Sequence, residues 1–191
     1  MKEINKTTQF AIRVLSDFSN KLIELLKEKP LEDISVHTIC LLCHYPRSTF
    51  YNYFDDIYDL MDYCWKIMIE DMELEKYLEG KNTLETFSVL YDYLSNYRED
   101  IQLITTKNPI DGRCMNSLRH FMRETIKEVV RQCPESKAFP IREDIMIDYY
   151  ALIIEMILEK CFFEVKPLSK EDALKSVQFL LITIEKEVHK E

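Results

Sequence analysis

The chain has 191 residues and a formal net charge of −9, with only two glycines and six prolines. Few glycines are typical of helical proteins, which need few residues at positive φ, and no alternating β-branched run indicates a sheet. The composition therefore predicts an all-α fold of one or two domains, and the two isolated glycines exclude a glycine-rich loop that cradles phosphates.

The first predicted element is a helix over residues 7–28, which the Lys29-Pro30 pair ends. Its apolar side chains recur at helical spacing and form one stripe: Ala11, Val14, Leu15, Phe18, Leu22, Leu25 and Leu26.

Residues 35–54 predict two short helices joined by a tight turn. Ser35 stands where an N-cap belongs, and Pro46 fits the first position of the second helix. That second helix, from about Arg47 to Tyr53, combines a cation, two hydroxyls, an amide and two phenols. Such side chains reach base edges and phosphates, so the pattern predicts a helix-turn-helix whose second helix enters a DNA groove.

The segment ISVHTICLLCHYPRSTFYNYFDDIYDL resembles the DNA-binding end of the TetR family of bacterial transcriptional regulators. The family's T-F-Y-x-x-F signature stands here as Thr49 to Phe54. The resemblance covers roughly residues 8–62, and beyond it only the length and the helical layout are similar. Two positions differ from the family: Ile57 replaces a lysine that commonly contacts phosphate, and His44 replaces the usual glycine of the turn.

The resemblance implies a DNA-binding helix-turn-helix domain of three helices over residues 1–57. Residues 58–191 would form a helical effector-binding and dimerisation domain. The implied function is that of a transcriptional regulator, more often a repressor in this family, which binds a palindromic operator as a homodimer and responds to a small-molecule effector. Two sets of residues are expected to contact DNA: Arg47, Ser48 and Asn52 at base edges, and Ser35, Thr49, Tyr51 and Tyr53 at phosphates.

Charge leaves a second interpretation open. Residues 1–54 carry seven basic and six acidic side chains, a net charge of +1, so the remainder carries −10. A nearly neutral head with Ile57 in place of lysine is also compatible with a co-regulator that acts through a protein partner. A steep salt dependence of DNA binding would distinguish the first interpretation from the second.

Further helices are predicted over residues 58–78, 113–132, 142–163 and 169–188, and residues 84–106 are predicted to form one or two helices. The break around Gly80 precedes a helix that Asn82 or Thr83 can cap. The helix over 142–163 is apolar on more than one face, which favours burial between two subunits. In TetR-like proteins the last two helices form such a dimer interface.

Aromatic and methionine side chains of the body are candidates to line a pocket for a small apolar or aromatic effector, and ordinary core packing is the alternative. The candidates are Trp65, Met68, Phe87, Tyr91, Phe121 and Tyr149. Asp148 and Glu155, seven residues apart, would either recognise a cationic effector or lie at a solvated edge of the dimer interface.

His37, Cys40, Cys43 and His44 have the residue types of a zinc site. The helical wheel instead places both cysteines on the core stripe, which favours packing, with thiol redox sensing as a further alternative. No hydrolase, metalloprotease or nucleotide-binding motif is present in the sequence, so neither an enzyme nor a bound cofactor is expected.

The chain is expected to be cytoplasmic and not inserted in a membrane. The apolar run Tyr149–Ile154 is far shorter than the roughly 20 residues that a membrane span needs. The N-terminal sequence MKEINKTTQF has no apolar segment of the kind found in signal peptides. The six cysteines are therefore expected to be free thiols.

Overall fold

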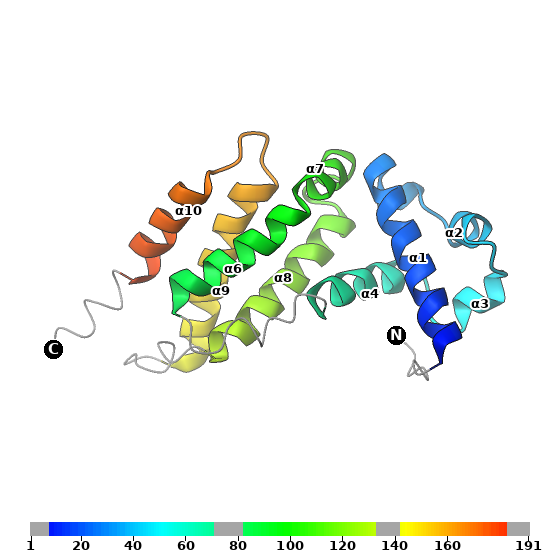
Figure 1. Cartoon of the computed structure of the whole chain (residues 1–191), viewed down its shortest axis with the longest axis horizontal. Coiled ribbons are helices and arrows are strands. Elements are labelled where there is room, and N and C mark those ends of the chain that lie inside the picture. Colours follow the sequence, from blue (N-terminus) through cyan, green and yellow to red (C-terminus); the bar gives the residue numbers. More distant parts are fainter. Residues whose placement is uncertain (1–7, 71–81, 133–141, 183–191) are drawn as a thin grey trace. The chain divides into compact units, whose positions relative to one another are not determined.

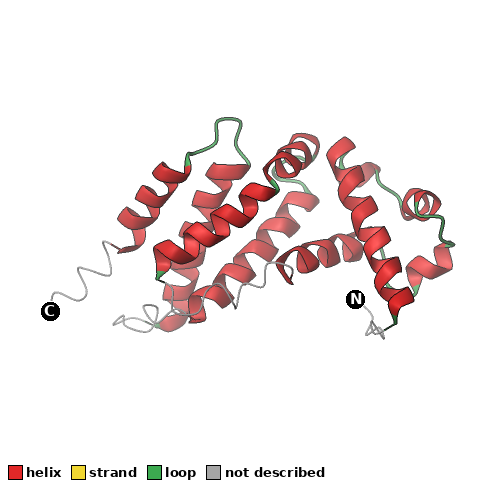
Figure 2. Cartoon of the chain, viewed as in Figure 1, coloured by secondary structure: helices red, strands yellow, loops and turns green. Residues whose placement is uncertain are grey.

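The computed structural model describes residues 8–70, 82–132 and 142–182 (Figure 1). In these ranges every regular element is a helix and no strand occurs, which confirms the predicted all-α class (Figure 2). The chain divides into two compact units, which are described separately. Unit 1 comprises residues 1–68 and 103–118, and unit 2 comprises residues 69–102 and 119–191.

Unit 1 is built on helix α1 (Gln9–Glu28), followed by the short 3₁₀ turn η1 (Leu31–Asp33), α2 (Val36–Leu42), α3 (Arg47–Tyr51) and most of α4 (Ile57–Glu70). The hydroxyl of Thr8 caps α1 by accepting a hydrogen bond from the backbone N–H of Ala11 at 3.2 Å. All seven residues of the predicted apolar stripe of α1 are buried, which confirms that part of the sequence analysis.

Helix α4 begins at Ile57, one residue before the predicted start. The Asp56 carboxylate caps it, accepting hydrogen bonds from the backbone N–H groups of Tyr58 and Asp59 at 2.9 and 3.0 Å. Ile57 itself is buried, so this residue, which stands where the resembled family commonly has a lysine, belongs to the hydrophobic core. The predicted boundary after residue 57 falls at this helix start, whereas unit 1 continues to Met68.

Unit 1 also includes the chain from Leu103 to Leu118, which a buried asparagine joins to the end of α1. The Asn108 side chain accepts a hydrogen bond from Leu31 N–H at 2.9 Å and donates to the carbonyls of Leu26 and Ile104 at 3.2 and 2.9 Å. One amide side chain therefore satisfies three buried backbone groups.

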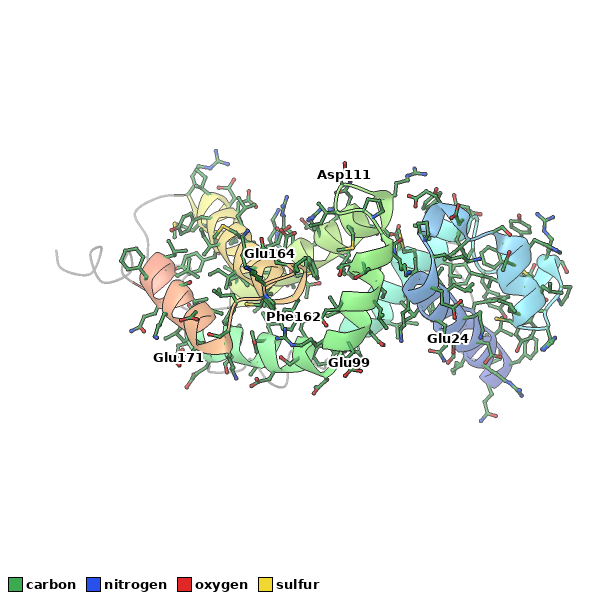
Figure 3. All side chains as sticks on the ribbon, turned by 90° about the horizontal axis from the view of Figure 1, so that it is seen from above. Glu24, Glu99, Asp111, Phe162, Glu164 and Glu171 are labelled. Atoms are coloured by element: carbon green, nitrogen blue, oxygen red, sulfur yellow. The ribbon has the colours of Figure 1, made fainter. Side chains whose placement is uncertain are left out.

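Unit 2 contains α6 (Thr83–Asn96), the start of α7 (Arg98–Lys107), most of α8 (Arg113–Gln132), α9 (Glu143–Phe162), α10 (Lys170–Val177) and the π-helical turn η3 (Gln178–Ile182). A capping box formed by Asn82 and Glu85 begins α6, and α8 has the predicted bounds. Helix α10 packs against both α6 and α9. Phe162 lies inside this unit, whereas Glu171 lies on its outer side (Figure 3).

Some predicted helix bounds extend beyond the described residues. Residues 84–106, predicted to form one or two helices, form two, because Tyr97 leaves the helical conformation between them. The last helix changes to a π-helical turn after Val177, and its predicted continuation to residue 188 lies outside the described residues. The same holds for residues 71–78, the predicted end of the helix that begins as α4.

Candidate nucleic-acid interface

The turn between α2 and α3 is a Schellman motif, a standard way to end a helix. The backbone N–H of Tyr45 donates to the Cys40 carbonyl at 3.0 Å, and the backbone N–H of His44 donates to the Leu41 carbonyl at 3.3 Å. This motif requires a left-handed residue, and His44 has a φ of 57°. His44 therefore adopts the conformation that glycine, the usual residue here in the resembled family, adopts without steric cost.

Two contacts join this turn to α1. The Tyr45 hydroxyl donates a hydrogen bond to the Asp17 carboxylate at 2.8 Å, and the Cys43 thiol donates to the Asp17 carbonyl at 3.4 Å. The Tyr45 ring also packs edge-on against Phe18 at 5.4 Å. These long-range contacts fix the direction in which α3 leaves the turn, and local sequence patterns do not reveal them.

The inner side of α3 is held by aromatic packing. Phe50 is fully buried and contacts the rings of Phe18 at 5.3 Å and Phe54 at 5.5 Å. Edge-to-face and tilted aromatic pairs at these distances are favourable. Phe50 and Phe54 thus anchor α3 to its own unit.

The other face of α3 and the residue after it are exposed. Helix α3 ends at Tyr51, two residues before its predicted end. Four of the seven predicted DNA-contacting residues are exposed on this short segment, namely Arg47, Ser48, Tyr51 and Asn52. Residues 34–54 contain one arginine and no aspartate or glutamate, so no carboxylate in this stretch opposes an approaching phosphate.

The remaining three predicted residues are placed differently. Thr49 is half-buried, and Tyr53 lies in the hydrophobic core with 8% of its surface exposed, so its ring is not part of the exposed face. Ser35 caps α2, accepting from Thr38 N–H at 3.1 Å, and its hydroxyl also bonds to the Thr38 hydroxyl at 2.9 Å. The structure therefore brings four of the seven together as one exposed polar surface.

Arg47 and Tyr51 contact one another on this surface. An Arg47 Nη2–H donates to the Tyr51 hydroxyl at 3.1 Å, and the guanidinium carbon lies 5.7 Å from the centre of the Tyr51 ring. This hydrogen bond raises the pKa of Arg47 above its ordinary value. The guanidinium stays cationic and has a defined position before any ligand arrives.

The six candidate effector-contacting residues fall on both units. Trp65 and Met68 belong to unit 1; Phe87, Tyr91, Phe121 and Tyr149 belong to unit 2. Phe87 and Tyr91, one turn apart on α6, have ring centres 6.4 Å apart. Phe121 is half-buried, and Tyr149 donates a hydrogen bond from its hydroxyl to the Leu180 carbonyl at 2.9 Å.

Two of these six residues, Trp65 and Tyr91, differ in how their polar groups are hydrogen-bonded. Trp65 is buried, and its indole N–H has no hydrogen-bond partner within the described part of the chain. Tyr91 accepts a hydrogen bond from Arg98 at 3.0 Å, and the guanidinium of Arg98 stacks on the Phe162 ring at 4.6 Å. Arg98 also donates to the Cys161 carbonyl at 3.0 Å, so it caps the end of α9.

Asp148 and Glu155 pair with basic residues of α8. Glu155 is buried and engages Arg123 through both carboxylate oxygens, while the exposed Asp148 pairs with Lys127 at 2.9 Å. A third ion pair joins Arg119 to Glu159. The basic residues recur at every fourth position of α8, a periodicity that could have predicted this row of ion pairs. Each of the two carboxylates suggested to recognise a cationic effector is thus paired with a basic side chain of the same protein.

The zinc interpretation has no geometric support, because no group of three or more metal-ligating side chains occurs among residues the structure describes. His37 and His44 are exposed, Cys40 is buried and Cys43 is half-buried. Burial raises the pKa of the Cys43 thiol to about 11. Both cysteines therefore remain protonated near neutral pH, which favours packing over redox sensing.

Across the described helices, none combines the length and apolarity needed to cross a membrane. In comparisons with protein-family models and with curated proteins, no match to this chain was found.

Proposed function

We propose that this protein is a TetR-like transcriptional regulator that binds a palindromic operator as a homodimer. The observation that carries the proposal is the exposed surface of Arg47, Ser48, Tyr51 and Asn52 on α3, whose opposite side is anchored by the buried Phe50. These side chains offer donors and acceptors to base edges and phosphates. Thr49 and Ser35 would add phosphate contacts at the margin of this surface.

Exposed apolar side chains on unit 2 support the homodimer. Ile145, Leu152 and Met156 are exposed on α9, and their spacing of seven and four residues places them on one face. Phe179 on η3 is exposed as well. An apolar face of this kind favours association with a second copy, which would place two α3 helices on half-sites related by two-fold symmetry.

A small apolar or aromatic effector is proposed to act on this dimer by shifting the population that matches the operator spacing. The six candidates of the sequence analysis remain the proposed contacts, and Trp65 and Met68 of unit 1 are considered separately from those of unit 2. The indole N–H of Trp65, which has no hydrogen-bond partner among the described residues, favours an effector that carries a hydrogen-bond acceptor.

One observation favours the second candidate, a co-regulator that binds a protein partner. Leu41 and Leu42, consecutive residues at the end of α2, are both exposed. With the buried Ile57 and the nearly neutral head, they suit a protein surface better than a phosphate backbone. Direct DNA binding distinguishes the two candidates.

The proposal is tested by comparing the DNA affinity of the wild type with that of Arg47→Ala. Fluorescence anisotropy measures this affinity on duplex DNA from upstream of the protein's own gene. If Arg47 reads a guanine, the variant loses about 1–3 kcal/mol of specific binding. Lys107→Ala is the matched control, because it also removes one exposed cation of unit 1 and lies outside α2 and α3. Equal affinity of Arg47→Ala and the wild type would remove Arg47 from the proposed interface.

A further inference from the structure

Arg47 and Tyr51 form a preassembled pair at the exposed surface of α3. Their spacing of four residues places them on one face of the helix, and the guanidinium both donates to the phenol oxygen at 3.1 Å and lies 5.7 Å from the ring centre. An exposed arginine without such a contact samples many rotamers, and binding must restrict all of them.

The tyrosine ring is itself held in place. It packs edge-on against Phe50, with ring centres 5.6 Å apart and an angle of 85° between the planes. Phe50 is fully buried against Phe18 and Phe54. The position of Arg47 is thus set through Tyr51 by the aromatic core of unit 1.

The hydrogen bond to Tyr51 leaves Arg47 able to bind a ligand. Arginine carries five N–H donors in a fixed plane, and the bond to Tyr51 occupies one of them. The phenol oxygen accepts from Arg47. Guanine presents two adjacent acceptors, N7 and O6, that match the arginine plane.

We propose that Tyr51 is a positioning residue that holds Arg47 in the orientation for reading a guanine in the major groove. The inference rests on the proposed function and adds to it a specific base and a division of roles. Tyr51 acts mainly through Arg47 and not as an independent phosphate contact. Preorganisation of this kind strengthens binding by lowering the entropy that the arginine loses on contact.

A double-mutant cycle tests this coupling on duplex DNA from upstream of the protein's own gene. Tyr51→Phe retains the ring and removes the hydroxyl, so we expect it to weaken binding by about 3- to 10-fold. In an Arg47→Ala background the same change should alter affinity by less than about 2-fold. Equal effects in both backgrounds would show that the hydroxyl acts independently and would overturn the inference.

A measurement without DNA separates this inference from the proposed function. Nuclear magnetic resonance relaxation of the Arg47 side-chain nitrogens reports their mobility in the free protein. We expect restricted motion in the wild type and greater mobility in Tyr51→Phe, with the exposed Arg13 side chain as the internal reference. Equal mobility of Arg47 in the two proteins overturns the positioning role even if both bind DNA. If no DNA binds, the proposed function fails and the relaxation data alone decide the positioning role.

Discussion

Arg123 on α8 and Glu155 on α9 form a bidentate ion pair, with Nε–Oε2 and Nη2–Oε1 distances of 2.6 and 3.0 Å. The Glu155 side chain is 5% exposed, whereas that of Arg123 is 40% exposed. The carboxylate therefore depends on this one guanidinium for compensation of its burial, while the arginine retains access to water.

Arg123→Ala is expected to lower the free energy of unfolding by about 2–3 kcal/mol, because it leaves the Glu155 carboxylate buried without its partner. The value lies below that of a fully buried pair because water reaches Arg123. Lys127→Ala is the matched control, since its partner Asp148 is exposed, and should cost less than about 1 kcal/mol. Urea unfolding measures both changes, and equal losses would show that burial of Glu155 does not set the effect.

Asn108→Ala is expected to destabilise unit 1 by about 2–4 kcal/mol. The substitution leaves the N–H of Leu31 and the carbonyls of Leu26 and Ile104 without their side-chain partner in a buried site. Asn20→Ala is the control, because Asn20 makes one exposed hydrogen bond to Ser16, and should change stability by less than about 0.5 kcal/mol. Thermal unfolding compares the stability of the two variants. A small loss of stability in Asn108→Ala would contradict the role of its buried hydrogen bonds in holding residues 103–118 to the end of α1.

His44→Gly is expected to stabilise the protein by about 0.5–1 kcal/mol. Glycine adopts the left-handed conformation at φ 57° without steric cost, and this gain exceeds the entropy that glycine adds to the unfolded chain. Leu42→Gly, two residues earlier and within α2, should have the opposite sign, with a loss of about 1 kcal/mol. Chemical unfolding measures the free energy of unfolding of both variants. Destabilisation by His44→Gly would contradict the claim that His44 is strained in the left-handed conformation.

The buried thiols predict a loss of stability at alkaline pH. Burial raises the pKa of Cys64 to about 12 and that of Cys161 to about 11, from an ordinary value of 9.0. Above pH 9 the unfolded chain releases these protons while the folded chain retains them, so the stabilisation present below pH 9 declines as pH rises toward 12.

Urea unfolding at pH 8 and pH 10.5 measures this decline. In the folded protein at pH 8, both thiols should also resist iodoacetamide, and peptide mass spectrometry should find them labelled only after unfolding. Rapid labelling of Cys64 in the folded state would contradict its burial.

Local sequence patterns predicted the helices well because capping and periodicity are properties of neighbouring residues. The stripe of α1, the bounds of α8 and the capping function of Asn82 all follow from such spacings. The early end of α3 and the burial of Tyr53 were missed, because they depend on how this segment packs within unit 1 and not on the spacing of its residues.

The candidate site was predictable in part for the same reason. The residue types of α3 indicated an outward polar surface. The contact between Tyr45 and Asp17 joins residues 28 positions apart, and Asn108 contacts Leu31 across 77 positions. Contacts of this range depend on how the helices pack, so no spacing rule within a helix reveals them.

The salt dependence of wild-type binding to DNA from upstream of the protein's own gene tests the central claim most directly. A dimer that places a cationic Arg47 against the DNA in each half-site should lose at least about 10-fold in affinity between about 50 and 200 mM salt, because cationic side chains held at the DNA displace condensed counterions. The account predicts this loss together with a stoichiometry of two chains per duplex. Absence of binding at the lower salt concentration, or binding that salt does not weaken, would contradict it.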